Sequence, residues 1–333
     1  MSAAELRDLI ADIAATHTEP PAGELPACWP TLVELGLPLV GIEEGRGGSG
    51  GSVTDLSVLV RALGRHGIST PLIECAVANW IVAAARGEAG PGLRTISVMG
   101  AVKGSAGGAL EGWAGGAVEA SSGWARHADE IVIHRDGIAL LADARASGVT
   151  IEPGTNVAGE PVDEIRLDAA NLVALASAPS ADAVRARLGL LRAAALTGAV
   201  AGAYELTRAH VTTREQFGRP LVRIPAVAAN LAMIKAALIE SEAALARADD
   251  ASLASAAAAR VIAGRAATRT ARIAHQLHGA IGVTAEYSLH RFTKRLWAWR
   301  DADTTEHAWS VLLGEQAAVG GEGVFWDELT ATH

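Results

Sequence analysis

The residues best suited to chemistry lie in one short segment, Arg-Glu-Gln-Phe-Gly-Arg-Pro at positions 214–220. Gly218 and Pro220 favour a reversal of the chain between two helices, so turn formation accounts for both. It does not account for Arg214, whose planar guanidinium suits a phosphate group, or for Phe217, whose ring can pack or stack. By itself the segment is still more typical of a helix–helix connection than of a ligand site.

Two further segments are rich in glycine. Residues 276–284, Gln-Leu-His-Gly-Ala-Ile-Gly-Val-Thr, break a helical pattern and are again more typical of a connection. The stretch at 42–51 could hold a phosphate, because backbone amides at a helix start attract anions. No Gly-Lys-Ser/Thr follows it and no buried strand precedes it, which argues against a P-loop and a dinucleotide-binding fold. We interpret it as a turn before a helix that Ser52 caps, with Asp55 in the first turn.

These segments need helices to position them, and the sequence predicts helices in both halves. Residues 1–87 are predicted to form an N-terminal helical domain. Residues 88–177, rich in Gly, Val, Thr and Ser, are predicted to form a shortened middle β domain. Residues 178–320 carry long alanine-rich stretches joined by short loops, which is typical of an antiparallel helix bundle. Residues 321–333 are predicted to be a tail.

The composition limits the class of protein. The chain has 333 residues, of which 50% are hydrophobic, and a formal net charge of −9. The acidic balance argues against a nucleic-acid-binding protein, and the apolar runs are too short to span a membrane. Cys28 and Cys75 are isolated and form no metal-binding motif, and the N-terminus lacks the features of a signal peptide. We therefore expect a reducing, cytoplasmic location.

Residues 214–220 and 276–287, in this order and separation, resemble two motifs of the acyl-CoA dehydrogenase family, the first without a mismatch. The N-terminal region from Gly36 through the glycine-rich stretch also fits that family, so the resemblance covers most of the chain. It implies a mainly α fold with a small β domain, in the order N-terminal helical domain, middle β domain and C-terminal helix bundle.

The resemblance implies FAD bound between subunits, with the bundle of one subunit holding the pyrophosphate and adenine side. On that basis Arg214 would pair with the pyrophosphate, because a guanidinium meets a diphosphate well. The implied cofactor-binding residues are Arg214, Gln216, Phe217, Gln276, Gly279 and Thr305.

The middle region departs from the family where the flavin ring would bind. The family's Thr-Glu-Pro, two residues, Gly-Ser-Asp loop is missing, and the corresponding residues 99–109 have the sequence Met-Gly-Ala-Val-Lys-Gly-Ser-Ala-Gly-Gly-Ala. The family's Trp-x-Thr element is reduced to Trp124-Ala125-Arg126, which keeps the indole and loses the hydroxyl. Each change removes contacts to a flavin.

The catalytic base is also altered. The family uses a glutamate at one of two positions to remove a proton α to a thioester carbonyl. Alignment from Gln276 without gaps places Asp303 at the first position, one methylene shorter, with Glu306 nearby. The second position falls near residues 187–188, where there is no acid. Asp303 has a second interpretation, as the cap of a helix starting at Thr304.

These features resemble the subunit with a degraded flavin loop found in heteromeric, steroid-catabolic acyl-CoA dehydrogenases of bacteria. The resemblance implies an α2β2 assembly with a complete homologous subunit, which dehydrogenates an acyl-CoA and passes electrons to an electron-transfer flavoprotein. Two alternatives stay open. One is a self-sufficient homomeric enzyme using Asp303 or Glu306 as base, and the other is a non-catalytic scaffold subunit.

Overall fold

The structure, a computed structural model, describes residues 2–90, 92–99, 117–248, 252–321, 323–324 and 326–327. The chain forms two compact units that interleave along the sequence. The bundle unit comprises Met1–Thr16, Ser57–Ile68 and Gly189–His333. The sheet unit comprises His17–Leu56 and Ser69–Leu188.

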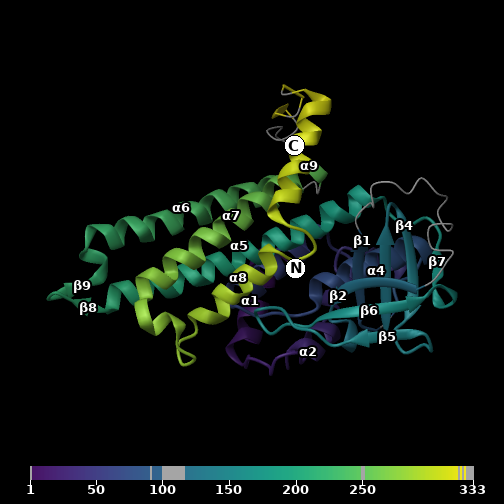
Figure 1. Ribbon diagram of the computed structural model, residues 1–333, viewed down its shortest axis with the longest axis horizontal. Helices are drawn as coiled ribbons and strands as arrows, with labels where there is room; N and C mark the ends of the chain where they lie inside the picture. Colours follow the sequence, from purple (N-terminus) through teal and green to yellow (C-terminus); the bar gives the residue numbers. More distant parts are fainter. Residues whose placement is uncertain are drawn as a thin grey trace. The chain divides into compact units, whose positions relative to one another are not determined.

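Long alanine-rich helices make up the bundle unit (Figure 1). Alanine has the highest helix propensity, and its small side chain lets neighbouring helices approach closely. The helices are α1 (Ala3–Ala15), α3 (Val53–Arg65, in this unit from Ser57), α5 (Ala181–Thr213, in this unit from Gly189), α6 (Pro225–Arg247), α7 (Leu253–His278), α8 (Leu289–Arg300) and α9 (Glu306–Gly320).

Parts of the N-terminal helical region belong to the bundle unit, whereas the sequence predicts a separate domain over residues 1–87. Helix α1 starts with a capping box between Ser2 and Glu5 and buries one apolar face. On α3, Arg65 forms an ion pair of 2.6 Å with Glu205 on α5. Apolar burial and cross-helix ion pairs thus group these elements with the bundle, although they are distant from it in sequence.

Helices α3 and α5 meet backbone to backbone. A methyl group added to Gly198 would collide with the carbonyl oxygen of Arg61, and one added to Gly64 would collide with that of Ala195. Glycine removes the side chain where two helices approach most closely, so these positions set the distance between α3 and α5.

We expect Gly198→Ala to lower the free energy of unfolding by about 1–3 kcal/mol, because the added methyl group overpacks this contact. Gly314→Ala on α9 is the matched control, since its Cβ would meet nothing within 4 Å. Alanine there should instead stabilise the helix by up to about 1 kcal/mol. Urea unfolding of the three proteins measures both effects, and a Gly198→Ala protein as stable as the wild type would contradict the close contact.

The sheet unit holds two sheets, with strand orders β1-β3-β4-β7 and β2-β6-β5. Strand β1 runs parallel to β3, and the other pairings are antiparallel. The buried core of these strands includes Ile131, Ile133, Leu140 and Leu167. The strands are β1 (Arg94–Met99), β2 (Ala117–Gly123), β3 (Glu130–Arg135), β4 (Ile138–Asp143), β5 (Val149–Glu152), β6 (Val162–Asp168) and β7 (Val173–Leu175).

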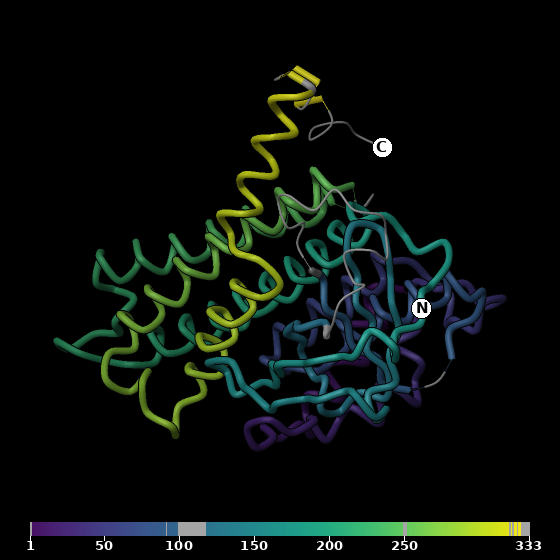
Figure 2. Tube along the Cα trace, turned by 45° about the vertical axis from the view of Figure 1, so that its right-hand side comes forward, coloured from purple at the N-terminus to yellow at the C-terminus, as the bar shows by residue number. Residues whose placement is uncertain are grey.

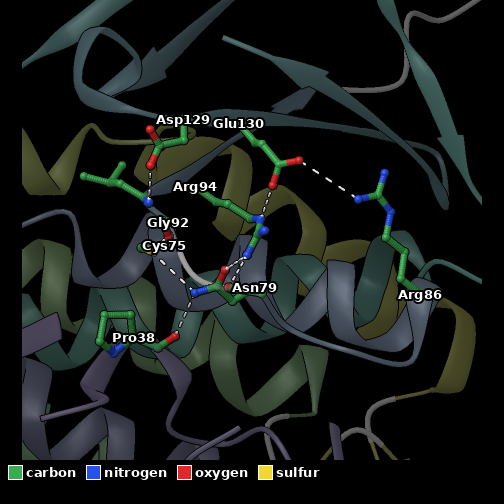
Figure 3. Close-up of polar contacts among 10 residues, drawn as sticks. Pro38, Cys75, Asn79, Arg86, Gly92, Arg94, Asp129 and Glu130 are labelled. Carbon is green, nitrogen blue, oxygen red and sulfur yellow. Dashed lines mark hydrogen bonds and ion pairs between the residues drawn. The ribbon is translucent and has the colours of Figure 1, made fainter. Parts of the chain in front are cut away.

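Helix α2 (Trp29–Glu34) and helix α4 (Leu72–Arg86) complete the sheet unit. A buried polar network joins α4 to the first sheet (Figure 3). The Arg94 Nε donates to Glu130 at 2.6 Å, and its Nη1 donates to Asn79 at 2.8 Å. The Asn79 amide in turn donates to the Pro38 carbonyl at 3.2 Å. Burial raises the pKa of the neighbouring Cys75 thiol to about 11, so this thiol is unreactive at neutral pH.

The mainly α fold with a small β region is confirmed. Helix α9 continues beyond the helices it packs against, and Figure 2 shows its far end extending away from them. Its first half buries Trp309 against α7, whereas Val319 near its end is 91% exposed. Within the described residues, no helix is both long enough and apolar enough to cross a membrane.

Candidate functional site

The segment at 214–220 forms a β-hairpin that ends α5 and leads into α6. Strand β8 (Glu215–Gln216) pairs with β9 (Arg219–Pro220), and Phe217 and Gly218 form the turn. Both turn residues have positive φ, 55° and 73°, as tight hairpin turns require. Figure 1 shows this hairpin at the end of the bundle helices.

The hairpin presents its functional side chains to the surroundings. Phe217 is 86% exposed, and Arg214 and Gln216 are also exposed. A left-handed backbone is costly for a bulky residue such as phenylalanine. An exposed aromatic ring on a strained turn gives the folded chain no packing energy, so the arrangement points to a partner surface or ligand.

A cluster of rings places the second glycine segment beside the base of the hairpin. His210, four residues before Arg214, stacks on His278 with 4.4 Å between ring centroids. The ring centroid of Tyr287 lies 5.1 Å from that of His278. Helix α7 ends at His278, and Gly279 follows with φ 62° and ψ −141°, a conformation open essentially only to glycine.

The predicted cofactor-binding residues of the two motifs therefore lie at one end of the bundle. Gln276 and Gly279 are exposed there, as are Arg214 and Gln216. The structure brings these motifs together, and their role in cofactor binding stays a prediction.

The ring cluster leads to a pH prediction. Burial lowers the pKa of His278 to about 4, with further lowering from His210 and His275, against an opposing bond to the Ala274 carbonyl. An unfolded histidine titrates near 6.5. Above that pH both states are neutral. As the pH falls toward 4 only the unfolded state gains the proton, so the free energy of unfolding should fall by up to about 3 kcal/mol.

Urea unfolding between pH 7.5 and 4 tests this. His278→Gln should remove the part of the pH-dependent difference that His278 contributes, while His307→Gln, at an exposed histidine on α9, serves as the control. Parallel stability profiles for the wild type and His278→Gln would contradict the prediction.

The second group of predicted residues lies beyond α8, in the connection to α9. Asp303 accepts two bonds from Arg192, at 2.8 Å from Nε and 3.2 Å from Nη2. Burial alone would raise the pKa of the Asp303 carboxyl, but Arg192 and Arg260 outweigh it, and the pKa lies below its ordinary value. A carboxylate held by an arginine in this way is a weak proton acceptor.

The other acid and hydroxyl of this connection are also engaged. Glu306 forms an ion pair of 3.1 Å with Arg265 on α7. The cap of α9 is Thr305, whose hydroxyl accepts from the Ala308 amide at 3.2 Å. The interpretation of Asp303 as the helix cap is therefore wrong, because α9 starts later than predicted and Thr305 is its N-cap.

Sequence reasoning missed the arginines that fix this connection. Arg260 is 1% exposed, and its Nη2 donates to the carbonyls of Trp299 and Arg300 at 2.9 and 2.7 Å. Arg192 lies on α5 within a run of leucine and alanine. A charged residue inside such an apolar run is the signal that could have indicated a buried ion pair.

In the sheet unit, the residues that remain of the Trp-x-Thr element pack and form hydrogen bonds within the unit. Trp124 is 4% exposed and has a φ of 63°. Arg126, at the position of the missing hydroxyl, donates its backbone amide and its Nε to Asp163, both at 2.8 Å. Neither side chain is free to contact a flavin. Residues 100–109, where the flavin loop was expected, lie outside the described residues.

The glycine-rich stretch at 42–51 makes its own turn. The amide of Gly48 donates to the Glu43 carbonyl at 3.1 Å, and that of Gly50 to the Ile42 carbonyl at 2.9 Å. Ser52 and Asp55 form the reciprocal bonds of a helix cap, at 2.8 and 3.1 Å. Amides used in this way are unavailable to a phosphate, which supports the interpretation as a turn before a helix.

The chain is similar to known proteins over most of its length. Residues 183–302 match the family model described as acyl-CoA dehydrogenase, C-terminal domain. The acyl-CoA dehydrogenase IpdE2 of Mycobacterium tuberculosis is 28% identical over 308 residues, covering 87% of this chain and 89% of that protein. The acyl-CoA dehydrogenase FadE28 of the same organism is 28% identical over 294 residues, covering 79% and 84%.

Two solved structures share the fold over nearly their whole length. A variant of the Tcur3481–Tcur3483 steroid acyl-CoA dehydrogenase superposes with a TM-score of 0.82 at 22% identity, covering 96% of this chain and 98% of that one. The ChsE4–ChsE5 complex of Mycobacterium tuberculosis gives 0.79 at 20% identity, covering 95% and 97%. The chain is therefore similar to acyl-CoA dehydrogenases over most of its length, and its C-terminal region matches that family's model.

Proposed function

We propose that this chain is the flavin-sharing subunit of a heteromeric acyl-CoA dehydrogenase, and that a homologous partner subunit holds the flavin ring and supplies the base. The observation that carries the proposal is a contrast between two regions of the chain. The hairpin of β8 and β9 exposes Arg214 and Phe217, whereas Trp124 and Arg126 are committed to the sheet unit's own packing. The side chains of the hairpin are thus available to FAD, whereas Trp124 and Arg126 are already engaged by the fold.

The available residues fit the phosphate and adenosine side of FAD. Arg214 offers a fork of donors for a pyrophosphate, and the exposed ring of Phe217 offers a stacking face. Gln276 offers donors and acceptors beside Gly279, where the absence of a side chain allows close approach. When bound, FAD supplies the hydride acceptor for α,β-dehydrogenation of an acyl-CoA. This chain's part is to bind and orient it.

We assign the base to the partner because neither candidate acid, Asp303 or Glu306, is poised for proton transfer. Asp303 is held by Arg192, and Glu306 is paired with Arg265. The second family position falls near Arg187, which is a cation. A homomeric enzyme would need Asp303 or Glu306 to leave its ion pair, so the structure favours the heteromeric reading.

The substrate and the wider assembly are proposed from the relatives. Both structural neighbours are named as pairs of different chains, and one of them, Tcur3481–Tcur3483, is described as a steroid acyl-CoA dehydrogenase. We propose a steroid-derived acyl-CoA as substrate, an α2β2 assembly, and an electron-transfer flavoprotein as the electron acceptor. A non-catalytic scaffold is the weaker alternative, because it would leave the exposed guanidinium of Arg214 without a phosphate to bind.

The visible absorption spectrum of the chain, purified alone and then co-expressed with its homologous partner, tests the proposal. We expect a colourless single chain and a yellow complex with one flavin for each pair of unlike subunits. A single chain that purifies as a homotetramer with full flavin occupancy would overturn the proposal and favour the homomeric enzyme.

A further inference from the structure

A buried arginine in the sheet unit has no charged partner. Arg187 is 8% exposed, and its guanidinium carbon lies 4.7 Å from the centre of the Trp80 ring. Its Nη2 makes one long bond of 3.4 Å to the Gly41 carbonyl. Its Nε is buried without a hydrogen-bond partner, and among the described residues no carboxylate pairs with it.

The other well-buried arginine of this unit shows what a satisfied cation looks like. Arg94 is 6% exposed, and its donors meet the Glu130 carboxylate, the Asn79 amide and the Gly90 carbonyl at 2.6–2.8 Å (Figure 3). Burying a charge without such partners is strongly unfavourable. Stacking on Trp80 offsets only part of the cost, because one cation–π contact is weaker than the hydration it replaces.

The environment of Arg187 is selective about the anion it would accept. Trp80 packs against an apolar cluster that contains Ile42 and Ala83. Several amides of the glycine-rich stretch next to Gly41, including those of Gly48 and Gly50, are used within that turn and are not free to bind a doubly charged phosphate. A single planar guanidinium with an unused Nε matches a carboxylate, which accepts two parallel bonds. The apolar surroundings suit the hydrocarbon that bears it.

We propose that Arg187 binds the free carboxylate of an acyl ligand, so that this chain recognises acids in which an apolar chain or ring system carries a second, unesterified carboxyl group. The inference deepens the proposed function and rests on it for the thioester end of the ligand. Arg187, which lies near the family's second base position, would then recognise the ligand in place of removing a proton from it.

The test is a binding measurement on the full chain, alone and with its partner where the two co-purify. Titration calorimetry compares glutaryl-CoA with valeryl-CoA and suberyl-CoA with octanoyl-CoA, pairs matched in chain length that differ in the terminal carboxylate. We expect the carboxylated member of at least one pair to bind roughly tenfold tighter or more, because the bond to a charged group is lost in the other. Arg187→Gln should abolish this preference, and Arg187→Lys should keep part of it.

Free glutarate distinguishes the source of the carboxylate. Stabilisation of the wild-type chain by glutaryl-CoA or suberyl-CoA but not by glutarate assigns the carboxylate to a thioester ligand. Stabilisation by glutarate that Arg187→Gln removes assigns it to a free acid, and either result supports the site. Equal binding within both pairs together with no effect of glutarate would overturn the proposal.

Thermal stability separates a binding role from a packing role. Arg187→Gln removes an uncompensated charge and should leave the melting temperature unchanged or raise it. Arg94→Gln, the matched control, breaks a satisfied network and should lower it. A loss for Arg187→Gln as large as that for Arg94→Gln would assign Arg187 to packing. None of these readouts needs turnover or flavin, so they fail independently of the proposed function, which the flavin spectrum tests.

Discussion

Arg214→Ala is expected to reduce the flavin affinity of the assembled complex by roughly 10- to 100-fold, because a bond between a guanidinium and a phosphate is worth about 1.5–3 kcal/mol. Arg214 is exposed at the start of the hairpin, so its removal leaves no cavity and no buried group unpaired. The fold should therefore be intact while FAD is lost on dilution or gel filtration. The ratio of flavin absorbance to protein, followed during titration with FAD, measures the change.

Arg208→Ala is the matched control, since this arginine lies on α5, six residues before Arg214, and is exposed like it. It should leave flavin content unaltered. Phe217→Ala should weaken FAD by a smaller factor, because stacking is weaker than a charged bond. If Arg214→Ala kept the flavin content of the wild type, the scaffold alternative would become the better account.

Features set by local chemistry could be predicted closely from the sequence. Ser52 and Asp55 were identified as a cap and its acidic partner, and the structure has both bonds. A β region was expected within residues 88–177, and strands β1 to β7 lie between Arg94 and Leu175. Glycine and proline marked the turn at 214–220. In each case the determining interactions lie within a few residues of each other, where a single sequence displays them.

Features set by long-range contacts could not be predicted in this way. Strand β1 is held by parallel pairing with β3. The alternation of polar and apolar residues along β1 is by itself only weak evidence for a strand. The partner of Asp303 lies on α5, distant in sequence, so the sequence could supply a carboxylate but not the arginine that neutralises it.

Asp303→Asn should destabilise the protein without slowing the assembled enzyme. Arg192 is 11% exposed and Asp303 29% exposed in their side chains, so the pair is largely shielded from water. The variant removes the carboxylate that neutralises the nearly buried guanidinium of Arg192. We therefore expect the free energy of unfolding to fall by roughly 2–4 kcal/mol. Asp301→Asn is the control. Its side chain is 52% exposed and pairs with the adjacent Arg300, so its effect should stay within about 0.5 kcal/mol.

Turnover per bound flavin decides whether the same carboxylate is also a base. If the partner supplies the base, Asp303→Asn in the complex should change this rate less than about threefold, whereas loss of a general base costs roughly 10²- to 10⁴-fold. A double-mutant cycle with Arg192→Leu then isolates the ion pair, because the double variant should recover part of the stability that each single variant loses. A large loss of turnover with flavin still bound would instead place the proton transfer on this chain, and Asp303 would have to leave Arg192 during the reaction.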